Sequence, residues 1–134
     1  MRTLVLADWS TVGANQTLTS ITQAANDYLD MSPFEDAVIW LDVRHVTVGF
    51  AMTMNVETAP LKDEPFFSPI GAKQTTLALA VGVQVAPILM NAPSISQLLP
   101  VARWLRWRVS ATSPSSAWST TFRILVCVHA RLLR

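Results

Sequence analysis

The sequence carries little charge for its length. Only 14% of its 134 residues are charged, against about 25% in an average globular protein, whereas 51% are hydrophobic. A soluble monomer normally exposes more charge than this. Either the core is unusually large or neighbouring subunits cover part of the apolar surface, and we prefer the second interpretation.

Cysteine and long apolar runs are also scarce. Cys127 is the only cysteine, which excludes an intramolecular disulfide. The longest apolar stretch, residues 77–90, contains Gln84 and Pro87 and is shorter than the roughly 20 residues that a membrane helix needs. The apolar run at the N-terminus is interrupted by Asp8 and is too short for a signal peptide. We therefore expect no transmembrane segment, no signal peptide and no membrane partner.

The second half of the chain lacks acidic residues altogether. Residues 65–134 contain seven cations and no Asp or Glu, whereas residues 1–64 contain all nine carboxylates and three cations. Two explanations stay open. Acids and cations can compensate each other on neighbouring strands, or two faces of opposite charge can favour head-to-tail packing of copies. The basic half has no RNA-binding signature, so we do not expect a nucleic-acid partner.

Motifs for catalysis or metal binding are missing as well. The four glycines stand far apart, which excludes a glycine-rich phosphate loop. His45 and His129 lie in no recognisable motif, and an enzyme would need one of them to meet a carboxylate in a cleft. Residues 62–64, between Pro60 and Pro65, are interpreted as a solvated loop tip, because a calcium loop would need alternating oxygen ligands and a glycine. We expect no catalytic site, no cofactor, no metal and no small-molecule substrate.

What the sequence does contain is apolar residues at every second position. This alternation, typical of half-buried strands, covers residues 36–46, 50–57, 101–109 and 118–128. Residues 75–85 alternate too, but their other face is also small or apolar, which predicts a strand covered on both sides. Gly49 predicts a tight hairpin between the first two strands. Asp42 and Glu57 could then face each other as an acid pair, although Arg44 beside them favours ordinary cross-strand charge pairing.

Shorter elements complete the predicted fold. Residues 3–7, 17–21 and 88–90 are predicted as short strands, residues 22–29 as a helical turn, and residues 94–99 as a turn of helix or a loop. Residues 130–134 could end the last strand or form an arm that docks on a neighbour. Seven or eight strands without β-α-β alternation predict an all-β fold, a single jelly-roll-like β-sandwich domain spanning residues 1–134.

The segment of residues 103–108, with the sequence RWLRWR, is the most unusual local feature. Its alternation places Leu105, Trp107 and Val109 on the inward face, and Trp104, Arg106 and Arg108 on the outward face. We prefer an intersubunit contact for the outward face, since Trp and Arg are enriched in interfaces. Two alternatives are pairing with acids of the same chain, and a ligand site in which Trp104 stacks on a sugar or base.

Three parts of the sequence resemble small virion-associated proteins of tailed bacteriophages, such as head decoration proteins. They are residues 37–49 (AVIWLDVRHVTVG), residues 54–67 (MNVETAPLKDEPFF) and the closing pair 102–110 and 118–128 (ARWLRWRVS and WSTTFRILVCV). The resemblance implies a β-sandwich without an active site that sits on or between capsid subunits. The closing pair also resembles the end of discoidin-type carbohydrate- or lipid-binding sandwiches.

The leading hypothesis is therefore a non-enzymatic capsid decoration or auxiliary subunit, made in the host cytoplasm and located in the virion. Its expected partners are other copies of itself and a major capsid or other virion protein. The candidate interface residues are Trp104, Arg106, Arg108, Lys62, Asp63, Glu64, Phe66 and Phe67. The alternative is a carbohydrate-binding module in which Trp104 or the loop of residues 62–67 contacts a glycan.

Overall fold

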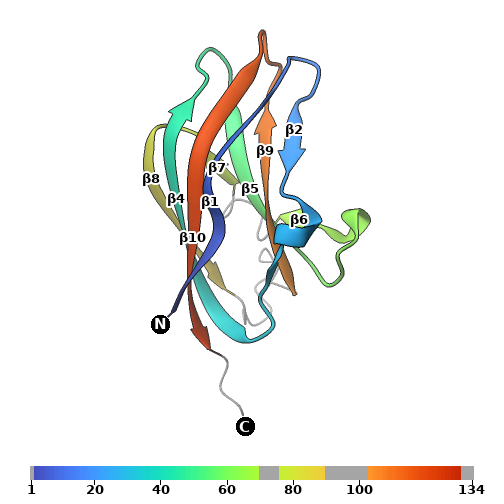
Figure 1. The fold of residues 1–134 in the computed structure, drawn as a ribbon, viewed down its shortest axis with the longest axis vertical. Coiled ribbons are helices and arrows are strands. Elements are labelled where there is room, and N and C mark those ends of the chain that lie inside the picture. The colour runs from blue at the N-terminus through green and yellow to red at the C-terminus, as the bar shows by residue number, and fades with distance from the viewer. Residues whose placement is uncertain (1, 70–75, 90–102, 131–134) are drawn as a thin grey trace.

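The computed structural model describes residues 2–69, 76–89 and 103–130, which form two antiparallel sheets packed face to face (Figure 1). Sheet A contains four strands in the order β1-β10-β4-β8. They are β1 (Arg2–Ala14), β4 (Phe34–Val46), β8 (Gly82–Leu89) and β10 (Trp118–Ala130). The protein is an all-β sandwich, as predicted.

Sheet B contains the remaining described strands, in the order β2-β9-β5-β6. They are β2 (Ser20–Thr22), β3 (Leu29–Asp30), β5 (Met52–Ala59), β6 (Ser68–Pro69), β7 (Thr76–Ala78) and β9 (Trp104–Ala111). The short strand β3 also pairs with β9, and β7 also pairs with β5. Two 3-10 turns, η1 (Ala25–Asp27) and η2 (Glu64–Phe66), lie in the connections of this sheet.

The strand order is that of a jelly roll. The chain passes repeatedly from one sheet to the other, and its first strand, β1, pairs with its last, β10. Within the described residues, counting β2 with β3, and β6 with β7, as two interrupted strands gives eight strand positions, four in each sheet. This agrees with the predicted number.

Every described strand pairing joins the acidic half of the chain to the basic half. Strands β1 to β5 come from residues 1–64 and strands β6 to β10 from residues 65–134, and each of the pairings in both sheets connects one group to the other. The charge asymmetry of the sequence is thus interleaved strand by strand. This favours the explanation by neighbouring-strand compensation.

The core lies between the two sheets and is built from the inward residues of the alternating segments. Ile39, Leu41 and Val43 of β4 are fully buried, as are the alternate apolar residues of β10 and β9. Across the interface, the rings of Trp107 and Phe122 meet edge to face with centroids 5.1 Å apart. The alternation therefore predicted the inward faces of β4, β9 and β10 correctly.

The prediction of one strand over residues 75–85, covered on both sides, is wrong. Residues 76–78 form β7 in sheet B, whereas β8 begins at Gly82 in sheet A. Gly82 has φ of +130°, a conformation that suits glycine, and it lies where the chain turns between the sheets. Val83 and Val85 of β8 are exposed at 60% and 49%, so their side of the strand is uncovered in the described structure, and Val81 just before it is exposed at 66%.

The predicted hairpin at Gly49 is also wrong. Gly49 has positive φ, but the strands that it connects, β4 and β5, belong to different sheets. Asp42 and Glu57 therefore do not face each other. The period-two pattern identified both strands, yet it does not specify which strands pair.

The short elements are partly as predicted. The strand predicted at residues 3–7 extends to Ala14, the one at 17–21 lies at Ser20–Thr22, and η1 is the predicted helical turn. Ile88 and Leu89 end β8 instead of forming a strand of their own. Residues 94–99 and 131–134 lie outside the described part of the chain. No helix among the described residues is long and apolar enough to cross a membrane.

Candidate functional site

The outer face of sheet B brings the two candidate segments of the sequence together. Strand β9 presents Trp104, Arg106 and Arg108 outward, and the connection between β5 and β6, which contains η2, folds over them. Residues 62–67 and residues 104–108, about forty positions apart in sequence, therefore form one cluster. Their proximity follows from the pairing of β5 with β9.

Arg106 is the centre of this cluster and is fully buried. Its Nε donates to Glu57 Oε1 at 2.9 Å, and its Nη1 and Nη2 donate to the two oxygens of Glu64 at 2.6 and 3.0 Å. Nη1 also donates to the Tyr28 hydroxyl at 3.0 Å, and the guanidinium lies 3.8 Å from the ring centroid of Phe67. A buried guanidinium requires such partners, and here all of them come from the same chain.

The charges of the cluster stabilise each other. The hydrogen bond from Arg106 lowers the pKa of Glu64 below its ordinary value, with further contributions from the charges of Arg106 and Arg108. Burial opposes the charged form of Arg106, but its hydrogen bonds to Glu64, Tyr28 and Glu57 outweigh this, so its pKa is raised. The network therefore holds the connection between β5 and β6 against sheet B. We call these five residues, Arg106, Arg108, Glu57, Glu64 and Tyr28, the clamp.

The other candidates surround this clamp. Arg108 Nη2 donates to Glu64 Oε1 at 2.9 Å, and Lys62 Nζ lies 4.3 Å from the ring centroid of Trp104. Asp63 is exposed at the start of η2, and Phe66 presents about half of its surface to solvent. Arg106 is thus enclosed within the chain, while Lys62, Asp63 and Phe66 lie on the surface.

The outer face of sheet A, in contrast, is uncovered and apolar among the described residues. The strand registers align Val5 with Leu125, Leu125 with Trp40, and Trp40 with Val85, which makes one row across all four strands. Val5, Trp40 and Val85 are exposed at 55%, 42% and 49%. Large exposed apolar side chains that adjoin each other are typical of a binding surface.

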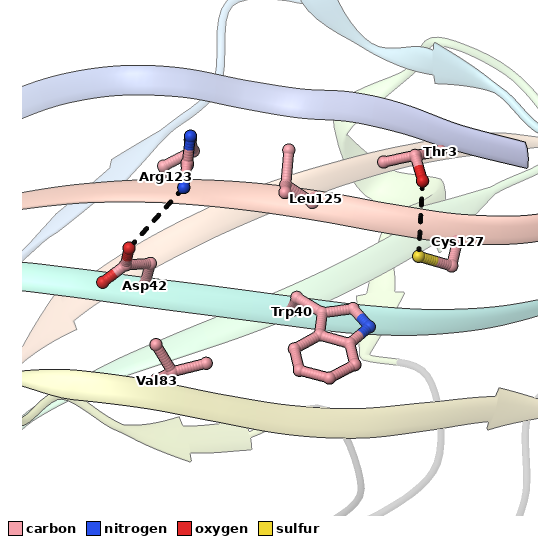
Figure 2. Close-up of a pocket in the computed structure, with 7 residues that line it drawn as sticks. All are labelled: Thr3, Trp40, Asp42, Val83, Arg123, Leu125 and Cys127. Atoms are coloured by element: carbon pink, nitrogen blue, oxygen red, sulfur yellow. Dashed lines mark hydrogen bonds and ion pairs between the residues drawn. The ribbon is translucent and has the colours of Figure 1, made fainter.

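A hollow of about 400 Å³ lies on this face (Figure 2). It is lined by Thr3 of β1, by Arg123, Leu125 and Cys127 of β10, by Trp40 and Asp42 of β4, and by Val83 of β8. Figure 2 shows these side chains standing on four adjacent strands. We call this hollow, with the row of Val5, Leu125, Trp40 and Val85, the sheet A surface.

Positive charge borders the sheet A surface. Arg44 Nε lies 3.1 Å from Asp42 Oδ1, and Arg123 Nη2 lies 3.7 Å from Asp42 Oδ2. Both guanidiniums also lie over the ring of Trp9, at 5.3 and 4.8 Å from its centroid. The Asp42 side chain is only 13% exposed, against 65% for Arg44 and 36% for Arg123, so solvent meets mainly the cations.

The sheet A surface is not among the candidate sites that the sequence predicts. The alternation of residues 36–46 places Trp40 opposite the inward set, and this is the signal that points to it. The prediction that residues 75–85 are covered on both sides hides this signal. The exposure of Val83 and Val85 follows from the sheet order, which periodicity does not contain.

The histidines and the cysteine make simple polar contacts. His45 Nε2 lies 3.1 Å from Ser119 Oγ, and among the described side chains it forms no ion pair with a carboxylate. His129 is exposed, and Cys127 Sγ lies 3.6 Å from Thr3 Oγ1. Within the described residues, no three His, Cys, Asp or Glu side chains gather to hold a metal ion.

Comparison with known proteins identifies no family. No protein-family model and no curated protein matches the chain. Among solved structures, the chain is similar to one described as "Structure of infectious bursal disease virus Gx strain", with a TM-score of 0.39 and 13% sequence identity. The match covers 93% of this chain but 30% of the other, so this chain spans less than a third of that chain's length.

Proposed function

We propose that this protein is a non-enzymatic structural subunit of a virus particle, a capsid decoration or auxiliary protein of the kind that its sequence resembles in tailed bacteriophages. It adheres to other virion proteins through the sheet A surface. Jelly rolls are common among viral capsid and lectin domains, but a fold alone does not fix a function. The proposal therefore depends on the surface.

The observation that supports an adhesive role is the apolar row of Val5, Leu125, Trp40 and Val85, of which Val5, Trp40 and Val85 are exposed. A half-exposed tryptophan in one row with a leucine and two valines from the three other strands presents apolar area to water that a protein partner would cover. The clamp on sheet B supports the same assignment indirectly. It pairs Arg106 and Arg108 of β9 with Glu57 and Glu64 of the same chain, so these two arginines need no acidic partner from another protein.

A particle-binding experiment tests this function. Virus particles from the source of the sequence are banded in a density gradient, and the chain is sought in the band by mass spectrometry of its peptides. Purified tagged protein is then mixed with particles depleted of it and sedimented. We expect the chain in the band and co-sedimentation of the tagged protein. A chain absent from the particles that also fails to co-sediment contradicts the proposal.

The second candidate function is carbohydrate binding, now at a different place from the one that the sequence indicated. Trp9 and Trp40 are both exposed on sheet A, and exposed tryptophans suit stacking on sugar rings, whereas Trp104 is half-buried under Lys62. Affinity chromatography on immobilised polysaccharides separates the candidates. Retention that free sugar reverses, without particle binding, would replace the structural role by a lectin-like one.

A further inference from the structure

We propose that the sheet A surface binds an acidic, apolar segment of a different virion protein, and not a second copy of this chain. This inference rests on the proposed function, because it specifies the partner of the same surface. It requires that an apolar side chain enters the hollow while a carboxylate beside it meets the arginines.

The shape of the surface sets the size of the segment. Neighbouring strands lie about 4.8 Å apart, so the row across four strands is about 14 Å long. This length matches two to three turns of helix or about four residues of extended chain. The hollow of about 400 Å³ has the volume of roughly a dozen water molecules and can admit a bulky apolar side chain.

The charges at the border determine the chemistry of the partner. Two guanidiniums share one carboxylate, that of Asp42, which leaves one positive charge in excess. The separation of 3.7 Å between Arg123 and Asp42 is longer than a hydrogen bond. A carboxylate from the partner would complete this group, and Arg recognises carboxylates well because its donors form a planar fork.

The same charges disfavour a second copy. A two-fold dimer whose axis passes near Asp42 would bring Arg44 and Arg123 of one chain toward the same arginines of the other, with both Asp42 side chains largely screened. Like charges opposed across an interface are unfavourable. An acidic partner gains from the arginines, whereas an identical face is repelled by them.

Variants of the sheet A surface test the inference in the co-sedimentation experiment. Trp40→Ala removes the centre of the row, and Arg44→Glu with Arg123→Glu reverses the border charge. We expect each to weaken particle binding by tenfold or more, and we expect wild-type binding to weaken as NaCl is raised. Val48→Ser, in the exposed connection between β4 and β5, is the matched control and should bind like wild type.

The possible outcomes separate this inference from the proposed function. If wild type does not bind particles, the proposed function itself fails. If wild type binds and the folded variants bind equally well, the structural role in the particle stands, whereas adhesion through the sheet A surface and this inference both fail. Charge reversal that strengthens binding would mean a basic partner and would overturn the inference. The inference would also be overturned if sedimentation velocity of the isolated chain showed a dimer that Trp40→Ala dissociates.

Folding is checked separately for each variant. Far-UV circular dichroism and a cooperative thermal transition must match those of wild type. If the double reversal does not fold, Arg44→Gln with Arg123→Gln removes the charge without introducing repulsion from Asp42, and the salt dependence of binding should then largely disappear.

Discussion

At the scale of single residues, Arg106 is a charged side chain on the outward face of a strand that is nevertheless fully buried. Alternation correctly assigned Arg106 to the outward face of β9, where it pairs with Glu57 of β5. It could not predict that both are buried, because the cover comes from the connection between β5 and β6. Where a connection lies depends on tertiary packing and leaves no periodic pattern in the sequence.

Removing Arg106 should therefore destabilise the protein strongly. We expect Arg106→Met to lower the free energy of unfolding by about 3 kcal/mol, because the buried Glu57 loses its shortest ion pair and keeps only Arg108. Arg44→Met, at an exposed pair, should cost less than about 1 kcal/mol. Urea denaturation measures both values. If the two variants lost equal free energy of unfolding, the burial of Arg106 would not determine how strongly its ion pairs stabilise the fold.

The clamp should also weaken in acid. The pKa of Glu64 is lowered below its ordinary value of 4.5 by its hydrogen bond from Arg106. A lowered pKa in the folded state means that the unfolded chain takes up the proton first, so this stabilisation is complete above about pH 4.5 and is lost as the pH falls through the folded-state pKa. We expect wild type to have the higher Tm at neutral pH, and its advantage over Glu64→Gln to shrink below about pH 4.5.

Thermal unfolding of both proteins between about pH 7 and about pH 3 measures this difference. Asp30, whose pKa is lowered chiefly by a backbone hydrogen bond from Ser32, contributes equally to both and cancels in the comparison. An advantage that stays constant over the whole range would mean that the ionisation of Glu64 does not contribute to the clamp.

At the scale of elements, prediction succeeded where one face of a strand is buried and failed where the chain changes sheets. Strands β4 and β10 pack their inward sides into the core, so their sequences alternate cleanly. Strand β1 was recognised only as residues 3–7, because its register with β10 shifts between Val5 and Ala7 and again between Ala7 and Ser10. A shift of this kind moves side chains to the other face and disrupts the alternation.

The far end of β1 depends on a glycine. A Cβ atom at Gly13 would lie 2.6 Å from the carbonyl oxygen of Trp118 and 2.9 Å from Ser119 Cβ, so the two strands approach too closely for a side chain. We expect Gly13→Ala to lower the free energy of unfolding by about 1–3 kcal/mol. Ser115→Ala, on the exposed connection between β9 and β10, should change it by less than about 0.5 kcal/mol.

Chemical denaturation of Gly13→Ala and Ser115→Ala measures the free energy of unfolding of each variant. A Gly13→Ala protein as stable as wild type would show that β1 can move away from β10 at this end without cost, and hence that the edge of sheet A is loosely held.

At the scale of the whole molecule, the two halves of the chain form the sheets only together. Each described pairing joins a strand of residues 1–64 to one of residues 65–134. The sequence displayed the charge asymmetry, but only the strand order explains it. Strands from the acidic half pair with strands from the basic half, and ion pairs such as Asp30 with Arg103 and Glu57 with Arg106 connect the two halves.

Two separate fragments of the chain should fold only when they are combined, because the strands of each half pair with strands of the other. We expect residues 1–64 and residues 65–134, prepared apart, to show no cooperative unfolding transition, since each lacks the described partners of its strands. When mixed, they should associate and regain the circular dichroism of the intact chain. Association should be slower at high salt, because nine carboxylates on one fragment attract seven cations on the other. A cooperative transition in the first fragment alone would contradict this account.

The pairing of β1 with β10 has a consequence for synthesis in the cell. A polypeptide leaves the ribosome from its N-terminus, so β1 emerges long before its described partner β10, with eight described strands between them in sequence. Until then, the apolar sides of β1, β4 and β5 have no finished sheet to join, and such nascent segments are ready substrates for chaperones. Because β10 lies between β1 and β4, sheet A cannot be completed before β10 has left the ribosome.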